Sequence, residues 1–385
     1  MGRPAFEVAQ IVRDHRGDLE AIQRLAPAQG RALSAIALCR TADLGGHQNV
    51  CLDCGQEEDP SYNSCRNRNC PKCQGLAQQR WIDARSRALL PIPHFHGVFT
   101  LPAQLRPLAW RYPEAIYDAM FRSVAATLLE IGASRLGATL GLTLVLHTWT
   151  RKLTYHVHLH VLITAGGLTP DGAAFKPVQE NFLLHVKPLA ELFKGKLMAA
   201  LRDLRSQGVL AMTDGAFGGL MAKLQDLNWH VYLKEAFQSP EHVLQYLGRY
   251  THRIGICNSR LLGATPNRIT FRTKGNGTEA VSPVEFLRRF IQHVLPPGLK
   301  KIRHAGLYGR PTALAQAKDL LGDLAVPAPP GPTPAAGQEP PTQKDDHRCK
   351  VCGGSLFPRL IPKSGPPKHP WRSSRRLFPA SRSPP

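Results

Sequence analysis

The 385-residue chain is short of acidic side chains and of long apolar runs. It carries 28 Asp and Glu against 49 Lys and Arg, which leaves a formal net charge of +21. No run of residues approaches the length of about 18 apolar residues that a transmembrane helix needs. The start of the chain is charged and lacks the apolar stretch of a signal peptide. We therefore expect a cytoplasmic protein, without a membrane partner, that binds a polyanion such as nucleic acid.

Cysteine is scarce outside one short block. Six of the nine cysteines lie between Cys39 and Cys73, and such clustering in a reducing compartment indicates metal binding rather than disulfides. Within the block, Cys51-x-x-Cys54 is followed after fifteen residues by Cys70-x-x-Cys73. This spacing is typical of a zinc ribbon, because each turn presents two thiolates and two turns complete a tetrahedron. We expect one structural Zn²⁺ on these four residues, whereas a redox dithiol would need only one pair.

Three further residues of the block have two interpretations. Cys39, His47 and Cys65 could complete a second zinc site that shares ligands with the first, or they could be small packed residues. The block also contains basic side chains that we expect to bind phosphate groups of DNA. These side chains are Arg66, Arg68 and Lys72.

Composition and periodicity divide the chain into five parts. They are an N-terminal helical segment (1–38), a zinc-binding domain (39–75), a central domain (76–265), a C-terminal accessory segment (266–325), and a Pro-rich linker with a disordered basic tail (326–385). In the central domain we expect strands at 95–101, 139–149, 153–163 and 229–235, and helices at 113–133, 189–207 and 239–250. Strands 139–149 and 153–163 are expected to form an antiparallel hairpin. This order of elements predicts an α+β fold with helices packed on an antiparallel sheet.

The stretch YHVHLHVLI, residues 155–163, places three histidines at every second position. Successive side chains of a strand point to opposite faces, so His156, His158 and His160 share one face while the apolar residues share the other. Neighbouring imidazoles on that face are about 7 Å apart at the backbone, close enough to converge on one ion or phosphate. A half-exposed strand with an incidental polar face is the ordinary alternative.

A helix expected at SPEHVLQYLGRY carries Tyr246 and Tyr250 four residues apart, so both hydroxyls lie on one face. Arg249 and Arg253 flank them. Such a pair is usually a packed aromatic stripe, but arginines and a preceding histidine-bearing strand favour chemistry. A cation on paired histidines could polarise a phosphate, arginines could neutralise its charge, and a tyrosine could become covalently attached.

Together these motifs resemble a known family. His158-Leu159-His160 is similar to the His-hydrophobic-His motif of HUH endonucleases. The segments CRTADLGGHQNVCLDCG, SCRNRNCPKCQG, FHGVFTLP, VLHTW, YHVHLHVLITAGGL and YLGRYTHRIGICNSRL resemble, in order, the two-tyrosine rolling-circle transposases of the insertion-sequence ninety-one family. The likeness runs from about residue 10 to 320.

The resemblance implies an HUH-type sheet with helices packed on it, preceded by a small zinc-ribbon-like domain. It implies a single-strand DNA endonuclease and strand transferase that acts on transposon ends and target DNA. His158 and His160 would bind catalytic Mg²⁺ or Mn²⁺, and Tyr246 and Tyr250 would attack in turn. The zinc domain would help to recognise the ends of the element.

Other assignments stay open at this point. His94-Phe95-His96 is a second match to the histidine motif, and His96 could line the same cleft. The third metal ligand could be any of four residues, Glu241, His242, Gln245 or His252. Cys349-x-x-Cys352 in the tail looks like half a zinc site. The alternative functions are a zinc-ribbon DNA-binding protein without catalysis and a metal-dependent phosphodiesterase that uses activated water.

Overall fold

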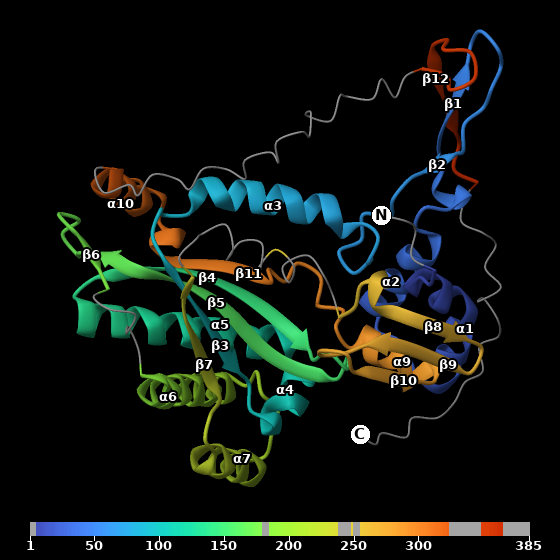
Figure 1. Cartoon of the computed structure of the whole chain (residues 1–385). Helices are drawn as coiled ribbons and strands as arrows, with labels where there is room; N and C mark the ends of the chain where they lie inside the picture. Colours follow the sequence, from blue (N-terminus) through green and yellow to red (C-terminus); the bar gives the residue numbers. More distant parts are fainter. Residues whose placement is uncertain (1–4, 179–184, 238–247, 249–254, 323–347, 365–385) are drawn as a thin grey trace.

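A computed structural model describes residues 5–178, 185–237, 248, 255–322 and 348–364. The chain is a mixed fold of helices and antiparallel sheets, as the pattern of elements predicted (Figure 1). In these ranges no helix combines the length and the apolar character needed to cross a bilayer.

A six-stranded antiparallel sheet forms the centre of the molecule. Its strands are β3 (His94–Thr100), β4 (Thr139–Trp149), β5 (Tyr155–Leu168), β6 (Phe175–Pro177), β7 (Val231–Phe237) and β11 (Ile302–Gly306). The strand order is β11-β4-β5-β3-β7, and β6 pairs with the far end of β5. The predicted hairpin of β4 and β5 is confirmed, because their residues pair antiparallel along the length of both strands.

Helices cover both faces of this sheet (Figure 1). The core face lies on α4 (Arg106–Arg111), α5 (Pro113–Ile131) and α6 (Val186–Ser206), and α7 (Asp214–Asp226) packs against α6 on the side away from the sheet. Helices α3 (Gln74–Ala88) and α10 (Pro311–Gly322) lie over the opposite face. Alternate residues of β5, such as Val157, Leu159 and Val161, are fully buried in the core with α5 and α6. The histidines between them therefore point to the face that α3 covers.

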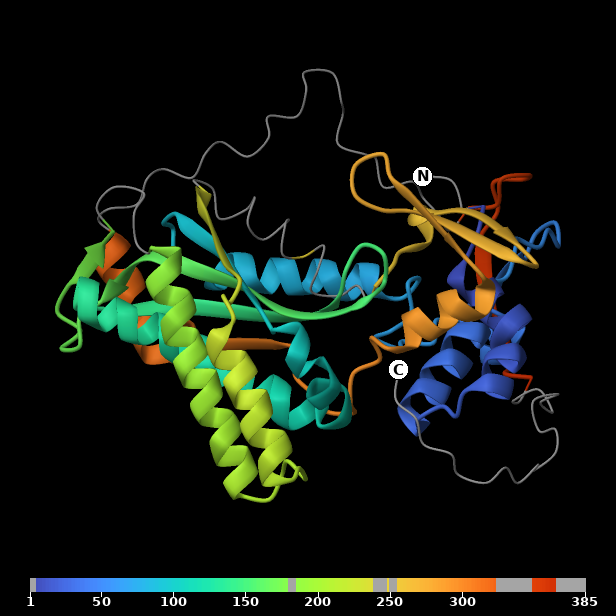
Figure 2. The same cartoon turned by 90° about the horizontal axis from the view of Figure 1, so that it is seen from below.

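A second lobe lies beside the sheet (Figure 2). It comprises α1 (Val8–Ile22), α2 (Pro27–Leu38), β8 (Leu261–Thr265), β9 (Arg268–Arg272), β10 (Thr278–Val281) and α9 (Pro283–Ile291). The N-terminal segment is two helices, since Pro27 begins a new one. Side chains of the N-terminal helices and of α9 share the core of this lobe, among them Ile11, Leu33, Phe286 and Phe290.

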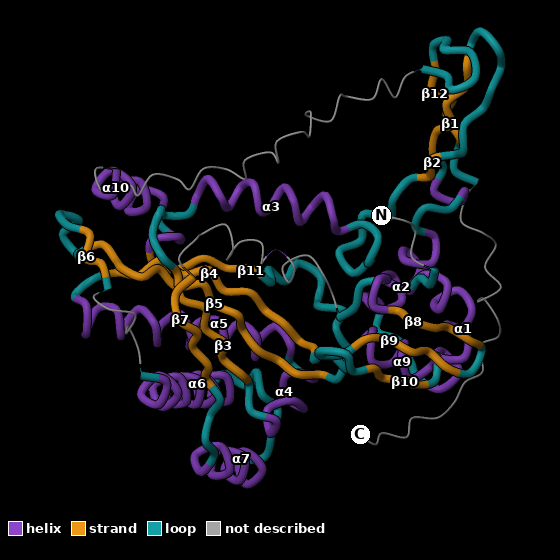
Figure 3. The backbone as a smooth tube through the Cα atoms, viewed as in Figure 1, coloured by secondary structure: helices purple, strands orange, loops and turns teal. Residues whose placement is uncertain are grey.

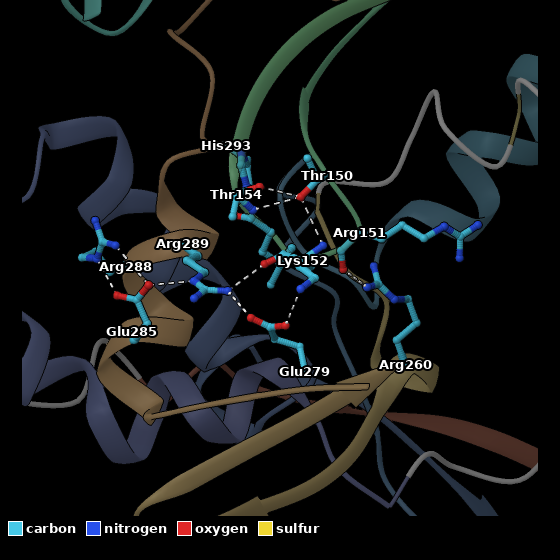
Figure 4. Close-up of polar contacts among 11 residues, drawn as sticks. Thr150, Arg151, Lys152, Thr154, Arg260, Glu279, Glu285, Arg288, Arg289 and His293 are labelled. Carbon is cyan, nitrogen blue, oxygen red and sulfur yellow. Dashed lines mark hydrogen bonds and ion pairs between the residues drawn. The ribbon is translucent and has the colours of Figure 1, made fainter. Parts of the chain in front are cut away.

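The turn of the β4–β5 hairpin docks on this second lobe (Figure 4). Lys152 forms an ion pair with Glu279 at 3.3 Å, and Arg289 Nη1 donates to the Lys152 carbonyl oxygen at 3.0 Å. Behind them, His293 Nε2 bonds to the carbonyl oxygen of Leu153 at 3.1 Å in a fully buried position. A surface ion pair contributes at most about 1 kcal/mol, so the buried His293 contact is the stronger anchor.

The last described segment is ordered, contrary to the expectation of a disordered tail. Strand β12 (Leu356–Ile361) pairs antiparallel with all of β1 (Gly46–Cys51), while β2 (Ser61–Tyr62) covers the start of the other edge of β1. These three strands project from the body of the molecule, and we call residues 46–62 and 348–364 the zinc arm (Figure 3). The rest of the predicted linker and tail, 323–347 and 365–385, lies outside the described residues.

Two fully buried histidines make stability depend on pH. Burial lowers the pKa of His94 and of His293 to about 4. The unfolded chain takes up these protons below its ordinary histidine pKa near 6.5, whereas the folded chain stays neutral down to about pH 4, so stability is lost as pH falls through this window. At about pH 5 each of the two histidines should lower the free energy of unfolding by about 2 kcal/mol relative to neutral pH.

We predict that urea unfolding will give a lower free energy at about pH 5 than at about pH 7.5, and that His293→Gln will flatten this dependence. His47→Gln, at an exposed position, is the matched control. An unchanged pH slope in His293→Gln would contradict the assignment.

Candidate functional site

Three histidines from two paired strands converge on the face of the sheet beneath α3. His147 of β4 is directly opposite His158 of β5, and His160 lies two residues further along β5. Their ring centroids are 4.3 to 5.3 Å apart, and one ligand nitrogen from each lies within 4.8 Å of the others. We call this group the histidine triad. The sequence predicted the shared face of His158 and His160 but assigned no role to His147.

Hydrogen bonds orient two of these rings. His160 Nδ1 lies 2.8 Å from His96 Nε2 on the adjacent strand β3, and His158 Nδ1 donates to the His156 carbonyl oxygen at 3.0 Å. Because the other nitrogen of an oriented imidazole is the usual metal ligand, both rings are suited to coordinate through Nε2. His94, from the second sequence match, bonds instead to the Tyr308 hydroxyl at 2.6 Å.

Burial keeps these imidazoles neutral. Desolvation lowers the pKa of His158 and of His96 to about 4, and it lowers the pKa of His160 well below its ordinary value. His147 and His160 are 2% and 8% exposed. His158 and His160 therefore have the neutral lone pairs that a divalent cation requires at neutral pH, and His147 lies within reach of both. His156 lies at the margin, where burial and the neighbouring Arg106 lower its pKa.

The predicted nucleophiles lie outside the described residues. So do their flanking arginines and the four candidates for a third metal ligand; the full set is Glu241, His242, Gln245, Tyr246, Arg249, Tyr250, His252 and Arg253. Gly248, midway between the tyrosines in sequence, is described and is buried against Ile82 of α3, where an added Cβ would lie 2.5 Å from Ile82 Cδ1. Ile82 in turn packs on the apolar cluster that includes Leu162, two residues beyond His160.

The cysteines divide differently from the expected ribbon. Among the described residues, one group of four is Cys39, Cys65, Cys70 and Cys73, and a second is Cys51, Cys54, Cys349 and Cys352. We call these the first and second cysteine clusters. The prediction of one site on both early Cys-x-x-Cys pairs is therefore corrected, because β1 carries Cys51 and Cys54 into the zinc arm while the other pair stays beside α2. Exposed His47 belongs to neither cluster.

The first cysteine cluster fits a structural zinc ion. Cys39 Sγ is 3.2 Å from Cys73 Sγ, and Cys65 Sγ is 3.5 Å from the same atom. Hydrogen bonds from Cys65 and Cys70 lower the pKa of Cys39 to about 2, while their contacts with Cys39 raise the pKa of Cys65 and Cys70. All four sulfurs could therefore be thiolates together only with a cation between them. Four sulfur ligands leave no position for water, which is the donor set of a structural rather than a catalytic zinc site.

Two of the predicted phosphate-binding side chains have protein partners. Arg68 donates to the carbonyl oxygens of Leu299 at 2.9 Å and Pro296 at 3.3 Å. Lys72 forms an ion pair with Glu7 at 2.6 Å. Both thereby attach the first cysteine cluster to the rest of the chain. Arg66 is exposed, and a phosphate-binding role for these three residues remains a prediction.

Comparisons with known proteins agree with this arrangement. Residues 11–101 match the family described as "Transposase zinc-binding domain", and residues 141–314 match the family described as "Putative transposase". "Putative transposase y4qJ" of Sinorhizobium fredii is 40% identical over 350 residues, which cover 86% of this chain and 87% of that protein. "Transposase for insertion sequence element IS801" of Pseudomonas savastanoi pv. phaseolicola is 30% identical over 344 residues, covering 83% and 80%. No solved structure matches.

The two family matches define the class of protein: it is a transposase, an enzyme that cuts and transfers DNA. Within that class, the chain belongs to the insertion-sequence ninety-one family, which confirms the resemblance found in its motifs.

His147 should matter to a bound cation as much as the two histidines of the sequence motif do. Loss of a residue that only orients a metal ligand typically lowers metal affinity about 10- to 100-fold. We predict that His147→Ala, which removes a ligand itself, lowers the affinity for Mn²⁺ by at least this factor, as measured by calorimetry. His304→Gln, on the same face but bonded to Thr143 at 3.0 Å, is the control that should keep the affinity. Equal affinity in His147→Ala and the wild type would remove His147 from the site.

Proposed function

We propose that this transposase nicks and rejoins single-stranded DNA, at transposon ends and in target DNA, through a covalent 5′-phosphotyrosine intermediate. The observation that carries the proposal is the histidine triad, a largely buried set of nitrogen donors on a sheet of a transposase. Gly248 supports it further, because it lies between the two tyrosines in sequence and is buried against Ile82 of α3. Helix α3 in turn lies over the face of the sheet that bears the triad (Figure 1).

In the proposed step the hydroxyl oxygen of Tyr246 or Tyr250 attacks the scissile phosphorus. A bond forms between tyrosine oxygen and phosphorus, the bond from phosphorus to the 3′ oxygen breaks, and the tyrosine proton ends on the leaving 3′ hydroxyl. The phosphodiester energy is kept in the new bond, so a 3′ hydroxyl can later reverse the step and rejoin a strand. Two tyrosines allow one to hold a cleaved donor end while the other cuts the target.

The triad residues His147, His158 and His160 would hold the cation, Mg²⁺ or Mn²⁺. When bound, such a cation polarises the phosphate and stabilises the departing 3′ oxygen. For His160 to coordinate through Nε2, its Nδ1 would carry the proton and donate to His96 Nε2 across the 2.8 Å contact. Arg106 Nη2 lies 3.2 Å from His156 Nδ1, and Lys234 of β7 is opposite His96 in the strand register, so positive charge lies close to the row of histidines.

A metal-dependent phosphodiesterase is the second candidate. Three histidine ligands also suit a cation that activates water, and that reaction would leave no protein–DNA bond. A DNA-binding protein without catalysis would use only the cysteine clusters and the positive charge, and would leave the buried triad without a role.

A denaturing gel separates these candidates. Purified protein is mixed with labelled single strands from both flanks of its own locus, in Mg²⁺, Mn²⁺ or EDTA. We predict a metal-dependent protein–DNA adduct that survives SDS, that each of Tyr246→Phe and Tyr250→Phe reduces, and that the double variant and His158→Ala abolish. Cleaved DNA without an adduct would favour the phosphodiesterase, and intact DNA bound tightly would favour the binding protein.

The contact between Gly248 and α3 gives a second test. Gly248→Val places a side chain into Ile82, so it should displace the two-tyrosine segment and lower the yield of adduct while DNA binding persists. Ile82→Ala removes the obstructing carbons and should restore part of the yield in the double variant. Gly75→Val is the control: Gly75 lies on α3, as Ile82 does, and no atom lies within 4 Å of an added Cβ there. Full activity of Gly248→Val would contradict the packing argument.

A further inference from the structure

The second cysteine cluster is built from two matching turns almost 300 residues apart in sequence. Residues 51–56 and 349–354 each read Cys-x-x-Cys-Gly-x. In both turns the amide of the first cysteine donates to the carbonyl oxygen five residues on, at 2.8 Å. In both, the glycine amide donates back to the carbonyl oxygen of the first cysteine, and the glycine takes a left-handed φ of 73° or 74°. Two separate segments thus adopt one backbone conformation that presents two sulfurs each.

The four sulfur atoms are spaced as zinc ligands are. Cys51 Sγ is 3.4 Å from Cys352 Sγ, and Cys54 Sγ is 3.7 Å from Cys349 Sγ. All four lie within 4.8 Å of one another. A tetrahedron with zinc–sulfur bonds of about 2.3 Å has edges of about 3.8 Å. A disulfide would need about 2.0 Å, so these contacts are those of ligands rather than of bonded pairs.

The zinc arm has almost no hydrophobic core to hold it together. Its cluster of buried apolar residues consists of Cys51, Cys349 and Leu356, and two of these are ligands. Other large apolar residues face solvent, with Leu360 82% and Phe357 53% exposed. Strands this short need an additional cross-link, such as a disulfide or a metal site, when they bury little apolar surface. A tetrathiolate metal site supplies it, because metal binding contributes directly to folding free energy.

We propose that Cys51, Cys54, Cys349 and Cys352 bind a second structural zinc ion that fastens the C-terminal segment 348–364 to strand β1. The site lies partly beyond residues 11–101 and 141–314, which the two family matches cover. It cannot assemble until residue 352 has been synthesised, so the zinc arm closes only after the sheet and the second lobe have been made. Loss of the ion releases β12 and exposes the edge of β1 that β12 covers.

Zinc content of the full chain tests the proposal. The parent protein is His158→Ala, so that zinc in the histidine triad is not counted, and it is purified under reducing conditions and measured by elemental mass spectrometry. We expect two zinc ions per chain in the parent and one after Cys349→Ser with Cys352→Ser. Ser355→Ala, in the same segment, is the matched control and should keep two. An unchanged zinc content in the double cysteine variant would overturn the proposal.

Alkylation of the unmutated chain tests it without relying on a variant that folds. Cys54 and Cys352 are exposed, so they should react quickly with iodoacetamide unless a metal holds them. We expect both to be protected until a strong chelator is added, while Cys257, outside both clusters, serves as the reference. Rapid labelling before the chelator would overturn the proposal. So would protection that a reductant alone removes, because that result would identify disulfides.

Discussion

The register between β4 and β5 is the constraint on which the rest of the molecule depends. Leu146 is opposite Leu159 on the core face, and His147 is opposite His158 on the other face. Because side chains alternate, a slip of one residue would turn the histidines into the core and the leucines out of it. The hydrophobic core therefore positions the histidine triad, and no separate interaction is needed to bring His147 to its partners.

Burial gives the triad its chemistry and also makes the fold sensitive to acid. The same desolvation that keeps His158 neutral and able to bind a cation acts on His94 and His293, which lie outside the histidine triad. His293 also anchors the turn between β4 and β5 to the second lobe through Leu153. One buried imidazole thus links the helices of the second lobe to the strands that carry the triad.

Sequence patterns within one segment predicted the features that depend on that segment alone. Alternation predicted β4 at residues 139–149 and the shared face of His158 and His160, because strand periodicity is a property of the segment itself. His147 was missed, although it stands in a predicted strand, because its place depends on how two strands align. The cysteines were grouped wrongly for a similar reason, since identical Cys-x-x-Cys turns carry no information about which pair meets which. Composition predicted a disordered tail, but β12 is ordered by a partner strand about 300 residues away.

The two kinds of metal site have different ligands, and these ligands favour different ions. Thiolates are soft ligands that select zinc and, four at a time, leave it no open position, so both cysteine clusters suit an ion that never exchanges during a reaction. Three imidazoles leave positions open, and the hard phosphate oxygens of DNA would complete the coordination of Mg²⁺ or Mn²⁺. Imidazoles alone bind zinc more tightly than Mn²⁺. In the proposed mechanism, a preference for Mg²⁺ or Mn²⁺ would therefore come from the bound DNA, and cation binding would be coupled to the presence of the strand to be cut.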